Sequence, residues 1–300
     1  AVTGVQTCAL PISINCAHMS ALGDILNDKE LSFQYRRNYF SIKTRINSMM
    51  WDNDTGFYHD LDKDGNRLSE KTIAGFWPLL AEIPSADKSE TLISHLMNPA
   101  TFGSDHPFPT LSADSPHYSA SGAGFRGSVF PMFNFIIIKG LEKYQRYELA
   151  RECSIRHLYF VLESFMPSDE NQKGDVFEAY MPGSSQKAVL EGVPDFPRPH
   201  FLAATGLSTI ALMIENVIGL SISLPRKTVD WIIPNLEIMG IENLSLKRNL
   251  ITILSNKSPR GWEIQMESEK LYYFTINIID QKKKTLPIPS GKCSMLIDKL

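Results

Sequence analysis

The sequence predicts a mainly α-helical protein with a small β-rich region at its end, on three observations. From residue 14 to about residue 219, apolar residues recur every three or four positions, as on one face of an α-helix. After residue 219, short runs of β-branched and aromatic residues alternate with turn residues. The expected helices also arrive in pairs. We therefore expect an α-helical toroid followed by a small antiparallel sheet or sandwich.

The helices of the first part are expected from their apolar spacing. Between residues 128 and 144, for example, Val129, Met132 and Phe133 begin a broad apolar face. The stretch 201–218 is apolar nearly all round, so we expect it to be buried on most sides. The expected helices span residues 14–26, 30–50, 72–81, 88–97, 128–144, 147–165 and 201–218.

Two segments between these helices are long, namely residues 98–127 and residues 167–200. Both are rich in aromatic, acidic, glycine and proline residues. Long irregular loops are uncommon in compact domains and often carry function. We therefore expect the functional site in these two loops.

The last part of the chain predicts short strands separated by turns. A basic run at residues 281–284 lies between two of the strands, where we expect a solvated hairpin tip. The expected strands span residues 220–224, 229–233, 250–254, 262–266, 272–279 and 294–297.

The composition argues against several classes of partner. A net charge of −3 gives no electrostatic attraction to nucleic acid or to acidic lipid surfaces. No apolar run reaches the length of a membrane span. Cys16, Cys153 and Cys293 are too widely spaced for a disulfide framework or a zinc site. The sequence leaves open the oligomeric state and the compartment, cytoplasm or periplasm.

The sequence also predicts neither a metal nor a cofactor. Asp60, Asp62, Asp64 and Gly65 begin like a calcium-binding loop, but Lys71 stands where such a loop needs its twelfth-position glutamate. We therefore expect a polar hairpin turn there. The histidines form no pair at helical spacing, and the sequence has no Gly-x-Ser-x-Gly elbow, Gly-x-Gly-x-x-Gly fingerprint or phosphate loop.

The first residues, AVTGVQTCALPIS, are expected not to belong to the natural protein. They lack the basic start and the long apolar run of a secretory signal. They resemble a common short-read sequencing adaptor translated in frame. We therefore expect residues 1–13 to be an artefactual leader, the protein proper to begin near Ile14, and the chain to be a fragment.

Glu178 is the most distinctive of the carboxylates in the two loops. Phe177 and Tyr180 flank it, and a Pro-Gly pair follows. A carboxylate among aromatic rings is an arrangement that raises a pKa and that can hold a sugar ring. The pattern therefore indicates a candidate acid–base residue in the second loop.

Five motifs, in order along residues 14–220, resemble those of one group of glycosidases. The first resembles a "W(D/N)-x-x-x-G-x-Y-x-D" hairpin, the third "W-R-G-P-V-W-P" followed by "G-L-x-x-Y", and the fourth "x-E-x-Y-x-P". The group is that of mannosylglycerate hydrolase-like enzymes and glycoside hydrolase family 63, six-hairpin relatives of the trehalases. The motifs are MWDNDTGFYHD at residues 50–60, WPLL at 77–80, FRGSVFP at 125–131 with Gly140, Leu141 and Tyr144 after it, FEAYMP at 177–182 and ENVIGL at 215–220.

The resemblance implies a fold, a reaction and a domain division. Members fold as (α/α)6 toroids, so residues 14–220 would be the C-terminal part of such a toroid and residues 221–300 a β-rich domain. The expected activity is that of an inverting, exo-acting α-glycosidase on an oligosaccharide or small glycoside, an α-glucoside or α-mannoside, without a metal. The general acid is an aspartate in an "S-G-x-D" segment, which would precede residue 14.

The resemblance also assigns roles to loop residues. Glu178 would be the general base that activates water. Arg126 would bind substrate hydroxyls or a carboxylate, and Tyr180 would pack on or orient the sugar. Phe125, Phe177 and Tyr118 complete the expected substrate-binding set.

The sequence departs from the family pattern at two places. Phe125 and Phe130 replace the two tryptophans of the Arg-Gly block, and residues 199–206 replace a Gly-Trp-Ser/Thr element. Two alternatives stay open. One is a catalytically inactive carbohydrate-binding toroid, against which the presence of Glu178 argues. The other is a different helical-toroid enzyme, such as a rhamnosidase or a polysaccharide lyase, for which Tyr118 and His117 would supply a Tyr/His pair.

Overall fold

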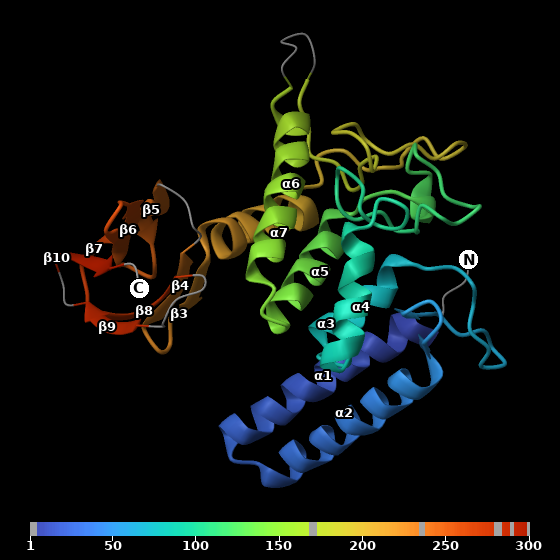
Figure 1. The fold of residues 1–300 in the computed structure, drawn as a ribbon, viewed down its shortest axis with the longest axis horizontal. Coiled ribbons are helices and arrows are strands. Elements are labelled where there is room, and N and C mark those ends of the chain that lie inside the picture. The colour runs from blue at the N-terminus through green and yellow to red at the C-terminus, as the bar shows by residue number, and fades with distance from the viewer. Residues whose placement is uncertain (1–4, 168–172, 234–237, 279–283, 289–290, 299–300) are drawn as a thin grey trace. The chain divides into compact units, whose positions relative to one another are not determined.

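A computed structural model describes residues 5–167, 173–233, 238–278, 284–288 and 291–298. The chain divides into two compact units, Ala1–Thr209 and Ile210–Leu300 (Figure 1). The first is helical and the second is built of strands, which confirms the predicted fold class. Among the described residues, no helix combines the length and the apolarity that crossing a membrane requires.

The helices of the first unit follow the apolar spacing of the sequence. Asp28 caps one of them, because its side chain accepts the backbone N–H of Leu31 at 3.0 Å. Pro131 begins another, where its missing N–H costs nothing. The described helices are α1 (Val5–Leu26), α2 (Lys29–Met49), α3 (Trp77–Leu80), α4 (Ala86–Met97), α5 (Pro131–Lys143), α6 (Tyr147–Phe165) and α7 (Leu207–Leu212).

Two predicted helices differ from the structure. In the stretch 72–81, a 3-10 turn at Ile73–Phe76 precedes α3. In the stretch 201–218, π-helical turns at Leu202–Gly206 and Met213–Ile218 flank α7. Many apolar side chains of this last stretch are exposed in the structure, with Leu202 at 61% and Leu207 at 67%. The prediction of burial on most sides is therefore wrong for this chain.

Helix α1 begins nine residues before the predicted start at residue 14, and it contains Pro11. It forms an antiparallel hairpin with α2 (Figure 1). The prediction of the helix start is wrong because residues of the expected leader continue the helix and pack: Leu10 and Ser13 have no exposed surface.

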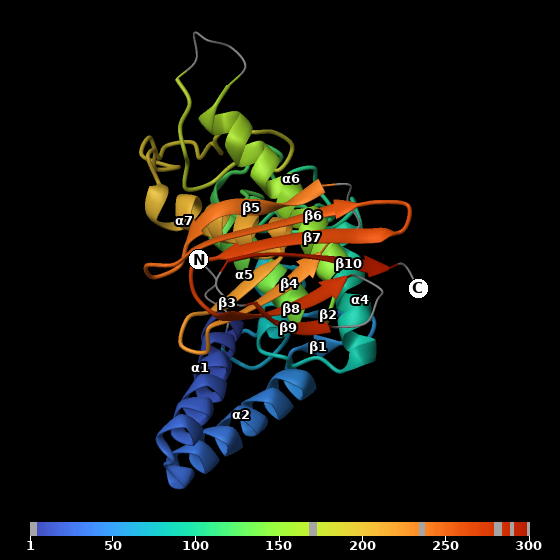
Figure 2. The same cartoon turned by 90° about the vertical axis from the view of Figure 1, so that its left-hand side faces the viewer.

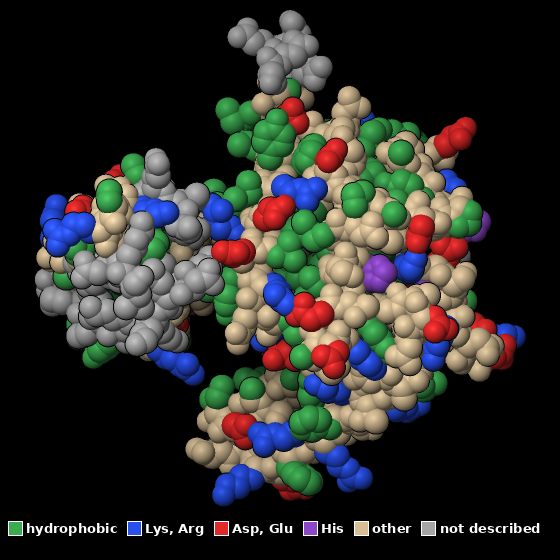
Figure 3. All heavy atoms as spheres, viewed as in Figure 1, with side chains coloured by type: hydrophobic (Ala, Val, Ile, Leu, Met, Phe, Trp, Pro, Cys, Tyr) green, Lys and Arg blue, Asp and Glu red, His purple; other side chains and the backbone are tan. Residues whose placement is uncertain are grey.

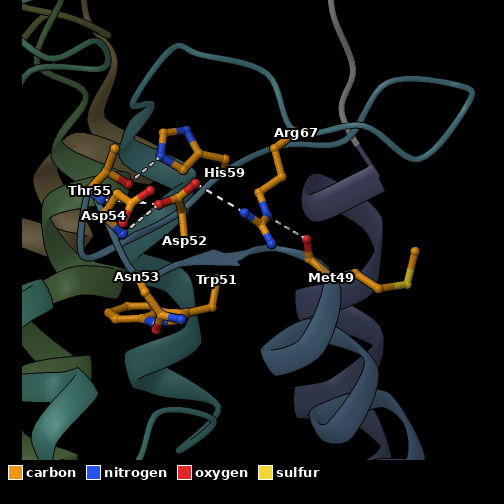
Figure 4. A network of polar contacts seen from close by, with 8 residues as sticks. All are labelled: Met49, Trp51, Asp52, Asn53, Asp54, Thr55, His59 and Arg67. Carbon is orange, nitrogen blue, oxygen red and sulfur yellow. Dashed lines mark hydrogen bonds and ion pairs between the residues drawn. The ribbon is translucent and has the colours of Figure 1, made fainter.

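The short hairpin of β1 (Trp51–Asp52) and β2 (Phe57–Tyr58) follows α2. Asp52 organises its turn, since its Oδ1 accepts the backbone N–H groups of Asp54 at 2.8 Å and Thr55 at 3.1 Å (Figure 4). Arg67 donates to Asp52 Oδ2 at 3.0 Å and to the carbonyl of Met49 at 2.9 Å. The hydrogen bonds that Asp52 accepts from Thr55, Asp54 and Arg67 lower its pKa below the usual value, and the bond from the Thr55 backbone N–H has the largest effect.

A second turn follows at residues 61–67 and is a polar hairpin, as predicted. Leu61 and Arg67 pair across it. The Asp62 side chain accepts backbone N–H groups from Asp64 at 2.8 Å and Asn66 at 2.9 Å. The carboxylate of Asp62 is therefore used to close the turn.

The second unit is a sandwich of two four-stranded sheets with orders β3-β4-β8-β9 and β10-β7-β6-β5 (Figure 2). Both sheets supply the core, for example Trp231 and Phe274 from one and Trp262 and Ile264 from the other. The strands are β3 (Leu220–Ser223), β4 (Thr228–Ile233), β5 (Ile238–Ser245), β6 (Leu250–Lys257), β7 (Gly261–Ser268), β8 (Tyr272–Ile278), β9 (Lys284–Ile288) and β10 (Gly291–Asp298).

The sheets are antiparallel at every described pairing except β4 with β8, which is parallel. Strands β5 and β9 lie where the sequence predicted no strand. Of the basic run at residues 281–284, Lys284 begins β9, and the rest lies outside the described residues, with the expected hairpin tip.

A buried histidine pair joins the first long loop of the first unit to helix α6. His157 Nδ1 is 3.0 Å from His106 Nε2 and 3.1 Å from the Asn134 amide nitrogen. Both imidazoles have no exposed surface. Burial lowers the pKa of His157 to about 3, and burial together with His157 holds the pKa of His106 well below its usual value.

We predict that this pair makes stability depend on pH. Below a pKa of about 6.5, histidines of the unfolded chain bind protons that the folded pair refuses. The free energy of unfolding should therefore fall as the pH drops from about 6.5 toward 3, by up to about 1.4 kcal/mol per pH unit for each imidazole. His157→Gln should make this dependence shallower in urea titrations followed by circular dichroism.

The matched control is His117→Gln, because His117 is exposed. It should keep the parental dependence on pH. An identical slope in the parent and in His157→Gln would contradict the prediction.

Candidate active site

Backbone hydrogen bonds join the two long loops of the first unit, one pair of them just before helix α5. Val129 and Tyr180 exchange both backbone hydrogen bonds, each at 2.9 Å. The N–H of His106 donates to the carbonyl of Pro182 at 3.0 Å, and that of Val189 to Ser121 at 3.1 Å. The structure thus brings the 125–131 and 177–182 motifs together, as a shared site requires.

Glu178 is held by contacts of both its side chain and its backbone. Its side chain is 18% exposed and forms a two-pronged ion pair with Arg198. Arg198 Nη2 donates to Oε1 at 2.7 Å and Arg198 Nε to Oε2 at 3.0 Å. The Glu178 backbone N–H donates to the Arg198 carbonyl at 3.0 Å, so backbone and side chain are both paired.

The electrostatics of Glu178 differ from the expectation for a carboxylate among aromatic rings. The hydrogen bonds from the Arg198 side chain lower the pKa of Glu178, and burial opposes this only in part. The expected rise of the pKa is therefore wrong, because the sequence pattern did not reveal the arginine. Glu178 is ionised at neutral pH, the state in which a carboxylate accepts a proton.

Tyr180 and Phe177 contact each other on either side of Glu178 and hold the backbone of this segment. Tyr180 has no exposed surface, and its phenol oxygen accepts the N–H of Phe177 at 3.0 Å. Burial raises the pKa of Tyr180 to about 12, so the phenol stays neutral. The ring of Phe177, half-buried, meets that of Tyr180 edge to face at 6.0 Å. Tyr180 is placed to hold the loop and faces no open surface.

Phe125 and Arg126 lie at the surface of the first loop. Phe125 is 70% exposed and stacks on Phe130 at 5.3 Å. Arg126 is exposed, and its carbonyl accepts the N–H of Ser119 at 2.7 Å. Both side chains are therefore open to a ligand.

Tyr118 packs against the glycine of the Arg-Gly pair. Gly127 has φ +141°, and a Cβ there would lie 2.5 Å from the carbonyl oxygen of Ser119 and 3.1 Å from the ring of Tyr118. Only glycine fits this position. Tyr118 is half-buried, and burial raises its pKa.

The aromatic row beside the site extends beyond the predicted residues. Phe130 contacts Phe133 at 5.3 Å and Phe196 at 6.2 Å, and Phe133 contacts Trp77 at 5.7 Å. Phe196 lies two residues before Arg198, so one segment supplies both an aromatic wall and the partner of Glu178. Sequence reasoning missed Arg198, Phe133 and Phe196, since nothing in periodicity or motif spacing links them to Glu178.

Residues 12–196 match the family described as "Mannosylglycerate hydrolase MGH1-like glycoside hydrolase domain". Residues 219–300 match "Trehalase, C-terminal domain". No metal-binding group of three or more His, Cys, Asp or Glu side chains occurs among the residues that the structure describes.

Similar proteins agree with these matches. An uncharacterised protein of Borreliella burgdorferi is 54% identical over 95% of the chain and 60% of its own length. A GH63 mannosylglycerate hydrolase from Thermus thermophilus, solved in complex with glucose, is 20% identical over 69% of the chain and 46% of its own, with a TM-score of 0.54. A sialidase structure is 15% identical over 86% of the chain and 25% of its own, with a TM-score of 0.64.

The two structures are too distant in sequence to show more than the fold. The chain spans about 60% of the length of the curated relative that it matches. Since the family match covers residues 12–196, well over half of the chain, the chain belongs to the mannosylglycerate hydrolase MGH1-like glycoside hydrolase family.

Proposed function

We propose that the protein is an inverting, exo-acting α-glycosidase for a small α-glucoside or α-mannoside, with Glu178 as its general base. The proposal rests on the charge state of Glu178. This half-buried carboxylate lies in the second long loop, within one of the family motifs, and Arg198 favours its ionised form. The family membership supports the reaction class. The Thermus thermophilus relative is a mannosylglycerate hydrolase solved in complex with glucose, which supports a mannoside or glucoside as the substrate.

In this mechanism Glu178 removes a proton from water. The water attacks the anomeric carbon on the face opposite the leaving group, while a second carboxyl group protonates the leaving oxygen. Inversion needs the two carboxyl groups roughly 6.5–9.5 Å apart, so that the water fits between them. We place the second carboxyl group in the part of the longer relatives that this chain does not span.

The exposed side chains of the first loop would bind the substrate. Phe125 presents an open ring face, on which the C–H groups of a sugar can pack. Arg126 is exposed and can donate to hydroxyl groups or to a carboxylate. Phe177 and Tyr118 are half-buried and would line the pocket, whereas Tyr180 would act by holding the loop.

We predict that Glu178→Gln, made in a full-length protein that contains this chain, lowers kcat by several orders of magnitude. The amide keeps the shape of the side chain and cannot accept the proton of the water. Steady-state hydrolysis of α-glucosides and α-mannosides measures the effect, and the melting temperature checks the fold. Asp195→Asn is the control, because Asp195 is exposed on the same loop and should keep parental turnover. Near-normal turnover of Glu178→Gln would move the base to Asp175 or Glu191.

We also predict that the 300-residue chain alone hydrolyses no α-glycoside and associates in solution. Large apolar side chains are exposed on its helices, among them Leu26 at 69%, Phe33 at 70% and Tyr159 at 63%. Figure 3 shows hydrophobic side chains, in green, at the surface of the helical unit. Exposed apolar surface of this kind favours association.

Light scattering and an activity assay, each run beside the full-length protein, check this prediction. A monodisperse monomer would contradict the first part. Hydrolysis by the chain alone would contradict the placement of the general acid.

A further inference from the structure

We propose that Arg198 is a positioning residue for Glu178: its guanidinium fixes the orientation of the carboxylate and keeps it charged for proton transfer. This inference rests on the proposed role of Glu178 as the general base. No sequence motif points to Arg198, whose role follows from the contacts around it.

The geometry of the ion pair fixes the Glu178 carboxylate. Two parallel N–H···O contacts, at 2.7 Å and 3.0 Å, prevent the carboxylate from rotating about its last bond. The backbone N–H of Arg198 lies 3.4 Å from Oε2 on the same side. A carboxylate has about four lone-pair sites, and these contacts use two on Oε2 and one on Oε1, so Oε1 keeps a site that can accept a proton from water.

Arg198 is itself held in place by its neighbours. Its Cζ lies 4.7 Å from the centre of the Phe201 ring, which binds the guanidinium by a cation–π contact. The N–H of Phe201 donates to the carbonyl of Val176 at 2.7 Å, and Glu178 donates to the carbonyl of Arg198. The backbone thus pairs residues 176–178 with residues 198–201, and this pairing aims the arginine at Glu178.

The ion pair contributes little to the stability of the fold. The Arg198 side chain is 63% exposed, and an exposed ion pair contributes little to stability because water screens the attraction between its charges. Removing the arginine should therefore leave the fold intact. Its main effect falls on the protonation of Glu178, whose pKa it lowers.

Other ionisable groups near the pair are few in the described part of the chain. Asp175 and His200 form a neighbouring pair on the same two segments, with Asp175 Oδ1 2.9 Å from His200 Nδ1. The aromatic residues Phe177, Tyr180 and Phe201 supply the remaining contacts named around Glu178 and Arg198. Arg198 is therefore the cation to which the charge state of Glu178 responds.

The test compares Arg198→Gln and Arg198→Lys with the parent in the full-length protein. We expect Arg198→Gln to lower kcat about 10- to 100-fold, the size of effect that a misplaced catalytic group produces. The acidic limb of the pH profile of kcat/KM should move to higher pH, because the uncharged side chain no longer favours the ionised carboxylate. Compared with Arg198→Gln, Arg198→Lys should bring the acidic limb of the pH profile part of the way back to its parental position, because lysine keeps the positive charge. It should hardly restore kcat, because lysine cannot form the two parallel hydrogen bonds to the carboxylate.

His200→Gln is the matched control. It removes the neighbouring pair with Asp175 on the same segment and leaves the contacts of Glu178 in place. It should keep the parental turnover and pH profile. A parental acidic limb and turnover in Arg198→Gln would overturn the proposal, and so would a rise of kcat, which would mean that Arg198 blocks the base.

A second measurement separates this proposal from the proposed function. Carbon-13 NMR follows the protonation of the Glu178 carboxyl group, whose resonance is the one that Glu178→Gln removes. If the titration midpoint of Glu178 is higher in Arg198→Gln than in the parent, the role of Arg198 is supported, whatever the activity of Glu178→Gln. If Glu178→Gln then keeps its activity, only the proposed function fails. An unchanged midpoint beside an inactive Glu178→Gln overturns the role of Arg198 alone.

Discussion

The two hydrogen bonds that Val129 and Tyr180 exchange are the contact on which the candidate site depends. They join two residues that are 51 positions apart in the sequence. Both residues have no exposed surface, so the bonds form away from competing water. Together with the hydrogen bonds from His106 to Pro182 and from Val189 to Ser121, they hold the Arg126 and Glu178 motifs beside each other. The buried histidine pair and Asn134 form a hydrogen-bonded cluster next to this junction, and the ring of His106 contacts that of Tyr180.

The chemistry of the site follows from how one carboxylate is charged. A general base must be unprotonated at the working pH, and burial alone would act against this for Glu178. Arg198 reverses the effect of burial and lowers the pKa. The cost of this arrangement is a weaker base, since a carboxylate with a low pKa accepts a proton less readily. The inverting reaction that we propose would tolerate this, because proton transfer to the proposed base would accompany the attack of water on an electron-poor carbon.

The sequence predicted the features that depend on the spacing of apolar residues, on short strand-like runs or on family motifs. The three- and four-residue spacing of Val129, Met132 and Phe133 indicated helix α5, and the short strand-like run at residues 262–266 indicated strand β7. The family motifs correctly indicated the glycoside hydrolase family. The role of Glu178 stays a proposal.

Features set by tertiary pairing could not be predicted. The parallel pairing of β4 with β8 joins strands separated by three others in the chain, and no local pattern records such a partner. The contact of Glu178 with Arg198 spans twenty residues of irregular loop. Its consequence for the pKa was missed for the same reason. The early start of α1 depends on packing of Leu10, which periodicity after residue 14 could not reveal.

The stereochemistry of hydrolysis tests the central claim most directly. Proton NMR of the anomeric hydrogen, recorded in the first minutes of hydrolysis of an α-glycoside by the full-length protein, identifies the first sugar anomer released. If Glu178 activates water in a single displacement, the β-anomer appears first and the α-anomer forms later by mutarotation. Initial release of the α-anomer would contradict the account, because it would mean that a carboxylate attacks the sugar as a nucleophile.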